Sequence, residues 1–232
     1  MTQQISPAPA VAKTDGRKRR WHQHKVERRT ELVDGALDAI RRRGRDVSME
    51  EIAAEIGVSK TVLYRYFVDK NDLTTAVMMR FAQTTLIPNM AAALSSDLDG
   101  FELTREIIRV YVHTVAAEPE PYRFVMANAS ADKNKAIADS EQIIARMLAV
   151  MLRHRMQRAG MDTRGVEPWA FLIVGGVQQA THSWMSHPRM SADDLIDYLT
   201  MLCWSALCGI VEVGGSLQAF RSQPHPPPVL PD

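Results

Sequence analysis

The sequence predicts an all-α protein of about nine helices, built from a small N-terminal head and a larger helical body. Apolar residues recur at spacings of three and four in nearly every segment, which is the period of an amphipathic helix. Serine and aspartate precede these segments, glycine ends them, and no segment alternates as a strand does. A chain of 232 residues, 46% of them hydrophobic, can bury one sizeable core or two small ones.

The charge of the chain is unevenly distributed. Residues 1–80 contain sixteen Lys or Arg and eleven Asp or Glu, whereas residues 81–232 contain twelve and sixteen, and the whole chain carries a net charge of only +1. A basic N-terminal part and a mildly acidic remainder suit a protein that brings one end to nucleic acid.

The sequence predicts neither a membrane span nor a secretion signal. No run of about 18 apolar residues is free of charge, and no apolar stretch follows the basic N-terminal segment. Cys203 and Cys208 are five residues apart on a predicted helix and point about 140° away from each other, so neither a disulfide nor a metal site is expected. These features predict a cytoplasmic protein without contact to a membrane.

Residues 1–21 are predicted to form a disordered basic arm. Pro7 and Pro9 stand among small and polar residues, and the chain becomes strongly basic from Gly16 onward. Such a cluster is either a solvated tail or an arm that contacts the backbone or minor groove of a nucleic acid. Its position directly before the head favours the second interpretation.

The predicted head, residues 22–68, begins with a helix from about His22 to Arg43 that ends at Gly44. Its basic last turn suits the negative end of the helix dipole. Its expected buried stripe consists of Val26, Leu32, Val33, Ala36, Leu37 and Ile40.

Two short helices hinged on Gly57 follow. Ser48 and Glu51 form a capping box for the first helix, and Ser59 caps the second, which runs to about Phe67. Two helices joined in this way are the helix-turn-helix arrangement, although an ordinary helical hairpin has the same pattern. The second helix favours nucleic acid, because it has no acid and its exposed positions suit a DNA groove: Lys60, Thr61 and Tyr64.

The predicted body, residues 69–215, consists of longer helices, and residues 216–232 are predicted to be a disordered, proline-rich tail. Pro88 is expected to kink or interrupt the first body helix. The expected helices are residues 70–93, 101–118, 120–129, 135–159, 166–187 and 191–213.

The last two predicted helices are apolar nearly all round. A helix of this kind must be buried on nearly all sides, and a second copy of the chain is the simplest cover for it. Gly175 and Gly176 reduce helix propensity, which makes sense where two helices approach closely. We therefore expect a homodimer that forms through these two helices.

The segment from Ile52 to Leu73, IAAEIGVSKTVLYRYFVDKNDL, closely resembles the DNA-binding signature of the tetracycline-repressor (TetR) family of bacterial transcription regulators. The match includes the Ile-Ala pair, Gly57-Val58-Ser59, Leu63-Tyr64 and the aromatic pair before Lys70. The chain departs from the usual family pattern at Lys60, Thr61 and Val62, which lie on the face that reads bases.

The resemblance implies a DNA-binding repressor that binds a palindromic operator as a dimer. By the same resemblance, Lys60, Thr61 and Tyr64 contact bases, and Arg65 contacts either bases or phosphates. The residues implied to grip phosphates are Ser48, Ser59, Tyr66 and Lys70.

In this family, the helices of the body enclose a cavity for a small apolar effector. A lining of apolar residues with a few polar groups would take a long apolar molecule with one polar end, although most of these residues also fit an ordinary core. The candidate lining residues are Met78, Phe81, Tyr111, Val115, Tyr122, Phe124, Met147, Met151, Phe171, Gln178 and His182.

The basic arm and the helix-turn-helix strings are similar to those of actinobacterial members that control lipid metabolism. That resemblance implies a long-chain fatty acid or fatty acyl-CoA as effector, with Arg105, Arg109 and Arg123 as candidates for the CoA headgroup. The rival effector is an aromatic or cationic drug, as in members that govern efflux pumps. Few buried acids occur in the middle helices, which disfavours a cation.

No motif of an enzyme occurs in the chain. It lacks HExxH, a glycine-rich phosphate loop and GxSxG, so we expect no catalytic residue, no metal and no cofactor. Apart from a DNA-binding regulator, the sequence also allows a non-enzymatic dimeric ligand-binding protein whose head no longer binds DNA. The cations Lys60, Arg65 and Lys70 argue against that alternative.

Overall fold

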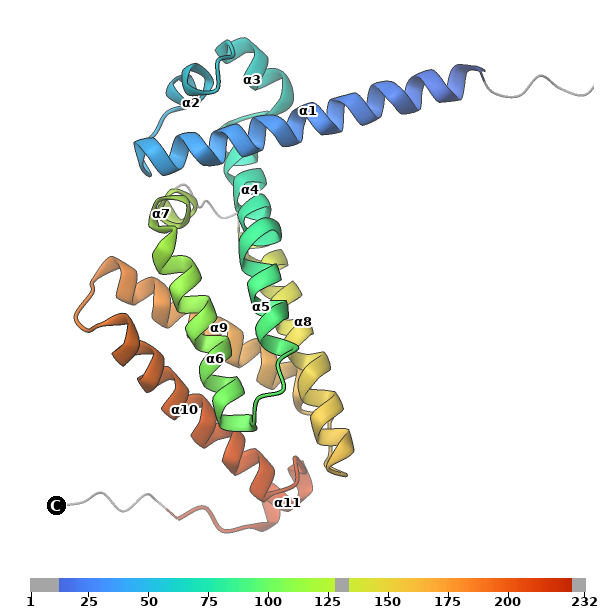
Figure 1. Cartoon of the computed structure of the whole chain (residues 1–232). Coiled ribbons are helices and arrows are strands. Elements are labelled where there is room, and N and C mark those ends of the chain that lie inside the picture. Colours follow the sequence, from blue (N-terminus) through green and yellow to red (C-terminus); the bar gives the residue numbers. More distant parts are fainter. Residues whose placement is uncertain (1–12, 128–133, 227–232) are drawn as a thin grey trace, which may run out of the picture.

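The computed structural model describes residues 13–127 and 134–226, and all its regular elements are helical (Figure 1). No strand occurs among these residues, which confirms the all-α class. The predicted disorder at residues 1–12 and 227–232 and the predicted helix end at residue 129 lie outside the described residues. The elements are α1 (Lys13–Arg43), α2 (Met49–Glu55), α3 (Lys60–Tyr66), α4 (Lys70–Phe81), the π-helical segment η1 (Ala82–Leu86), α5 (Ile87–Leu94), α6 (Gly100–Ala117), α7 (Pro119–Ala127), α8 (Asn134–Arg158), α9 (Val166–Ser186), α10 (Ala192–Glu212) and α11 (Leu217–Ser222).

Helix α1 begins at Lys13, so the prediction of a disordered arm up to residue 21 is wrong for residues 13–21. No proline interrupts the sequence between Lys13 and Arg43, and Lys and Arg are good helix formers. Once the second half of α1 is fixed by packing, adding turns to its N-terminus needs no new nucleus. Val26, predicted to be buried, lies on this exposed part of the helix.

The head packs α1, α2 and α3 around one core. Ile40, Ile52, Leu63 and Phe67 are fully buried there, and the predicted capping box of Ser48 is present. The core continues into α4 through Leu73 and Val77, so the head extends beyond the predicted boundary at residue 68. Between α2 and α3, Gly57 takes the predicted left-handed conformation, with φ of 71°.

Pro88 interrupts the first body helix, as predicted, and the interruption takes the form of a π-helical turn. The N–H of Ile87 donates to the carbonyl of Ala82, five residues earlier. In a regular α-helix the Pro88 ring would clash with the carbonyl of Thr84. The wider turn relieves that clash and lets α5 start with proline in its first turn.

The body has two apolar clusters. One joins α5, α6, α9 and α10 through residues such as Ile108, Val112 and Ile196, and the other joins α8 to α9 through Leu148 and Val166. Figure 1 shows α4 as the element that leads from the head into this body.

Helices α9 and α10 are only partly covered in the single chain. Leu172 is 74% exposed and Leu202 is 68% exposed. Among the described residues, α10 alone is long and apolar enough to cross a membrane by length and composition, and 22% of its apolar window is buried. The predicted burial on nearly all sides therefore requires a cover that one chain does not supply.

The C-terminal segment is more ordered than predicted. Gly214 and Gly215 have positive φ and turn the chain, and Ser216 accepts a hydrogen bond from the N–H of Ala219 to cap α11. The prediction of disorder from residue 216 is therefore wrong for residues 217–222. The serine cap explains where this short helix begins.

Candidate nucleic-acid interface and interior cavities

Helix α3 presents one polar face to the outside of the head. The Ser59 hydroxyl accepts the N–H of Val62 at 3.3 Å and fixes the start of the helix. Leu63 and the C-cap Phe67 are fully buried, which anchors the opposite face. As a result, four of the predicted DNA-contacting residues are exposed side by side on two turns: Lys60, Thr61, Tyr64 and Arg65.

Two other predicted DNA-contacting residues, Ser48 and Tyr66, are held by contacts within the head. The Ser48 hydroxyl donates to the Glu51 carboxylate at 2.7 Å, and its backbone N–H donates to the same carboxylate at 2.8 Å. Tyr66 is half-buried against the core of the head. Both residues therefore have structural roles within the head, and their contacts to phosphate stay predictions.

An ion pair restrains Lys60 in the free protein. Its ammonium donates to the Glu50 carboxylate on α2 and lies 5.6 Å from the centre of the Tyr64 ring. The hydrogen bond raises the pKa of Lys60 and lowers the pKa of Glu50. Both groups are charged at neutral pH, so Glu50 competes with DNA for this cation.

Lys70 and Phe124 meet where the head contacts the body. The Lys70 ammonium lies 5.3 Å from the centre of the Phe124 ring, and Phe124 is fully buried in the core of the head. Phe124, predicted to line a ligand cavity, lies instead in the core of the head and lines neither of the body cavities described below. Its neighbour two residues earlier, Tyr122, belongs instead to a body cluster.

Helix α7 connects to the head by ion pairs as well as by Phe124. Glu118, which precedes α7, accepts two hydrogen bonds from Arg41 at 2.8 and 2.9 Å, and this contact raises the pKa of Arg41. Glu120 accepts the backbone N–H of Arg45 at 3.0 Å. The end of α1 is thus fixed to the start of α7.

A small cavity of about 60 Å³ lies in the body next to α7. Six of the eleven residues that were predicted to line a ligand cavity line this space. His182 lies beside it, with its ring centre 5.9 Å from that of Tyr122, and its buried Nδ1 has no hydrogen-bond partner among the described residues. The six predicted residues in its lining are Met78, Phe81, Tyr111, Val115, Tyr122 and Gln178.

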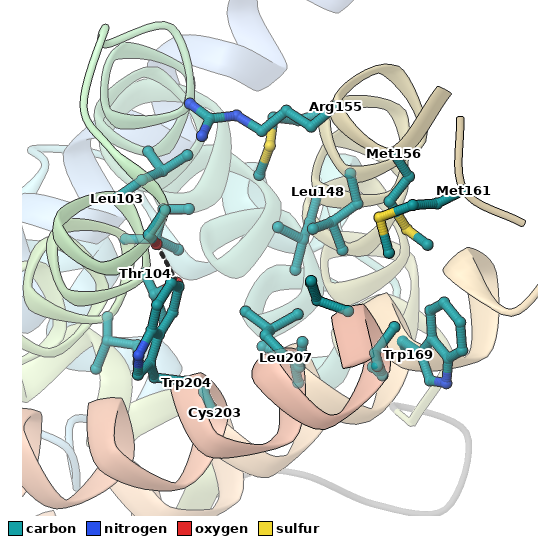
Figure 2. Close-up of a pocket in the computed structure, with 18 residues that line it drawn as sticks. Leu103, Thr104, Leu148, Arg155, Met156, Met161, Trp169, Cys203, Trp204 and Leu207 are labelled. Carbon is teal, nitrogen blue, oxygen red and sulfur yellow. Dashed lines mark hydrogen bonds between the residues drawn. The ribbon is translucent and has the colours of Figure 1, made fainter. Parts of the chain in front are cut away.

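A larger cavity of about 240 Å³ lies between α6, α8, α9 and α10 (Figure 2). Its walls are almost entirely apolar, and the indoles of Trp169 and Trp204 stand on opposite sides of it in Figure 2. Arg155 is the cation of the lining; its exposed side chain lies at the edge and donates to the Leu98 carbonyl at 3.1 Å. Of the predicted residues, only Met151 lines this cavity.

The two cavities follow one another along α6. Ile108 lines the larger cavity and Tyr111, about one turn later, lines the smaller one. Helix α9 repeats this arrangement with Ile173 and Gln178. The apolar cluster between them contains Val112 and Val177, so ordinary packed side chains separate the two spaces.

The other predicted ligand contacts lie elsewhere. Met147 and Phe171 line neither cavity, and Phe171 is on the partly exposed surface of α9. The cations proposed for a CoA headgroup are paired with acids: Arg105 with Asp197, Arg109 with Glu106 and Arg123 with Glu120. Sequence reasoning missed Arg155, because a cation in the last turns of a helix matches the helix dipole equally well.

Among the described residues, no group of three or more His, Cys, Asp or Glu side chains could hold a metal ion. The candidate functional site has two parts: the polar face of α3 on the head and the apolar cavities in the body. Helices α4 and α7 connect these two parts.

Comparison with known proteins decides the family. The description "Bacterial regulatory proteins, tetR family" matches residues 32–77, and "Tetracyclin repressor-like, C-terminal domain" matches residues 89–217. The chain belongs to the TetR family. As a TetR-family member it is a DNA-binding transcriptional regulator and not an enzyme, and regulators of this family act as dimers.

Individual relatives agree with this assignment. The chain is 84% identical over 224 residues to an uncharacterized HTH-type transcriptional regulator of Mycobacterium tuberculosis, with 96% of each chain covered. It is 22% identical over 183 residues to the HTH-type transcriptional activator FasR of Mycolicibacterium smegmatis, covering 78% of this chain and 83% of FasR.

A solved structure of a TetR-like regulator shares the fold. The transcriptional regulator FadR from Bacillus subtilis, in complex with stearoyl-CoA, superposes with a TM-score of 0.58 at 17% identity. The match covers 75% of this chain and 96% of FadR. At this identity the likeness supports the arrangement of head and body.

Proposed function

We propose that this TetR-family regulator is a cytoplasmic, ligand-responsive repressor that senses a long-chain fatty acid or fatty acyl-CoA. The observation that carries this proposal is the larger cavity, whose apolar walls end in a single exposed cation, Arg155. Apolar walls suit an acyl chain, and a guanidinium at the edge suits a carboxylate or phosphate. The bound stearoyl-CoA of the FadR structure supports the same effector class.

The size of the cavity bears on how such an effector would enter. A volume of about 240 Å³ is below the usual range for ligand pockets, roughly 300–1,000 Å³. A long chain therefore has to open the cavity, most simply by displacing the packed side chains that separate it from the smaller cavity near α7. Ligand entry would then move residues that contact the head.

On the DNA side, we propose that Lys60, Thr61 and Tyr64 read bases in the major groove. Arg65 is proposed to contact either bases or phosphates, and Ser48, Ser59, Tyr66 and Lys70 are proposed phosphate contacts. A homodimer through α9 and α10 presents two such helices, so the operator is expected to be a palindrome with half-sites about 34 Å apart, or a small multiple of that distance.

The coupling between effector and DNA is proposed to pass through α7 and α4. Tyr122 lines the smaller cavity while Phe124, on the same helix, fills the core of the head. An effector that prefers one position of α7 shifts the population of head positions, and a coupling of about 1–3 kcal/mol is typical of such linkage. We propose that the effector favours the position that releases DNA.

A neutral aromatic effector is the second candidate, because the lining of the larger cavity includes both Trp169 and Trp204. Regulation of an efflux pump would fit an effector of this class. No Asp or Glu lines the cavity, which disfavours a cationic drug.

A thermal-shift panel tests the effector class. Stearoyl-CoA at about one hundred times its dissociation constant is expected to stabilise the protein by about 2.7 kcal/mol, which raises Tm by roughly 5–10 °C in a chain of this size. Arg155→Ala should reduce that increase, whereas the matched variant Arg158→Ala, outside the cavity, should retain it. A panel that responds to aromatic compounds or amphipathic cations but not to acyl chains would contradict the lipid proposal.

A further inference from the structure

The N-terminal extension of α1, residues Lys13–Arg28, projects beyond the head. Figure 1 shows α1 passing α2 and α3 and leaving the head on the side away from α10. The last firm anchor is Arg29, which donates to Asp72 at 2.7 Å and stacks 4.6 Å from the centre of the Phe67 ring. Residues 19–28 are all exposed.

The composition of this extension excludes most partners. It contains seven Lys or Arg, two acids and only two large apolar residues, Trp21 and Val26. These two are five positions apart, so they point about 140° away from each other and form no stripe. Packing on a protein groove or lying in a membrane surface requires an apolar stripe, which the extension lacks. A strongly basic helix without such a stripe fits a polyanion.

The position of the extension identifies which polyanion. Arg29 lies against Phe67 at the end of α3 and against Asp72 in the first turn of α4, so the extension leaves the head beside the helix assigned to the DNA groove. Sixteen helical residues span about 24 Å, which equals about seven base pairs at 3.4 Å each.

We propose that the N-terminal extension of α1 binds the phosphate backbone of the DNA that flanks each operator half-site. The contact is electrostatic and indifferent to sequence, and it lengthens the bound DNA by up to about seven base pairs on each side. This inference rests on the proposed role of α3 as the reading helix. It adds a second DNA-contacting surface that the helix-turn-helix does not include.

The test varies the flank and the extension together. The DNA probe is the palindrome that the wild-type protein selects from a randomised duplex library, either trimmed to its edges or flanked by about ten base pairs on each side, which exceeds the reach of the extension. The variant carries Arg19→Gln, Arg20→Gln and Lys25→Gln, because glutamine is a good helix former that removes the charge. The control neutralises three cations of the body with the same charge change: Arg146→Gln, Arg158→Gln and Arg221→Gln.

The wild type and the control are expected to bind the flanked duplex about tenfold more tightly than the trimmed one, and the variant to lose a large part of that difference. The slope of log affinity against log salt should fall by about two in the variant, and only on the flanked duplex. Equal binding of both duplexes by the wild type, or an unchanged flank effect in the variant, would overturn the proposal. Loss of preference for the palindrome on the trimmed duplex would contradict the role of α3 instead, and the flank comparison still reports on the extension.

Discussion

At the scale of single residues, the pair of Lys60 and Glu50 determines what α3 offers to DNA. The two side chains come from different helices of the head and remain exposed, so the pair contributes little to folding. Its importance lies in competition, because Glu50 occupies one of the three N–H donors that Lys60 can give to a phosphate or a guanine edge. Two substitutions separate the role of the lysine from that of its acidic partner.

Lys60→Ala is expected to relax sequence preference, with a loss of about tenfold to a hundredfold in affinity for the cognate operator, because a base contact is removed. Lys70→Ala, in contrast, should weaken binding to all sequences alike. Both effects are measured by anisotropy on the operator and on a scrambled duplex. Full operator discrimination by the Lys60→Ala protein would remove Lys60 from the reading face.

Glu50→Gln is expected to strengthen DNA binding several-fold, because it frees Lys60 and removes an anion from the DNA-facing side. The change should be larger at low salt than at high salt. Glu106→Gln is a suitable control, since Glu106 pairs with Arg109 on α6 of the body and not with α3 or α1. If Glu50→Gln bound DNA more weakly than the wild type, the pair would have to position Lys60 rather than restrain it.

At the scale of elements, α7 is the helix that belongs to both parts of the molecule. Its Phe124 completes the core of the head and its Tyr122 lines a body cavity, while Glu118 and Glu120 hold the end of α1. These contacts lie in α7 or directly before it. A shift of α7 relative to the body would therefore also move residues that contact the head. The core of the head is completed by a residue from α7.

Phe124→Ala should lower the free energy of unfolding by about 3–5 kcal/mol, the usual cost of removing a buried phenyl ring. It should also reduce the effect of any ligand on DNA binding. Chemical denaturation measures the first effect, and Phe220→Ala, which removes a 50%-exposed ring from α11, is the matched control with a small expected change. A loss below about 1 kcal/mol would show that Phe124 does not support the core of the head.

The elements differ in how far the sequence predicts them. Helices α2 and α3 begin where Ser48 and Ser59 predict, because a cap depends on atoms within three residues. The direction of Phe124 was not predictable, since Tyr122 and Phe124 are both aromatic residues of one short helix and only long-range packing decides which domain each one enters. The extension of α1 was missed because a basic composition fits a disordered arm as well as a helix supported from its C-terminal end.

In the candidate site, too, features that depend on local sequence were predicted and features that depend on long-range packing were not. Exposure of Lys60 and its neighbours follows from the local helical period, so the exposed face of α3 was predicted. Six lining residues of the smaller cavity were also predicted, but the larger cavity depends on how α6, α8, α9 and α10 cross. No local pattern identifies Arg155 as its cation, because crossing angles arise from packing between distant segments.

At the scale of the whole molecule, α9 and α10 carry an apolar surface that the single chain leaves exposed to solvent. Large side chains such as Leu172, Tyr198 and Leu202 are mostly exposed in the single chain. Exposed apolar surface of this extent marks an interaction site. A second copy of the chain would cover it and would place the two heads at a fixed separation.

Leu202→Glu is expected to convert the dimer into a monomer and to abolish tight operator binding, because the charge would be buried in the proposed interface. Folding of the single chain should be unaffected, since Leu202 is exposed within it. Light scattering after size-exclusion chromatography measures the mass, and Val150→Glu on α8, 65% exposed, is the control. A Leu202→Glu protein that remained dimeric would place the interface elsewhere.

The most direct measurement is an anisotropy titration of the purified protein against the DNA upstream of its own gene and of the neighbouring genes, with and without stearoyl-CoA. We predict specific, salt-dependent binding that stearoyl-CoA weakens, through a coupling of about 1–3 kcal/mol. Specific binding that saturating stearoyl-CoA leaves unchanged would contradict the account of a lipid-responsive repressor.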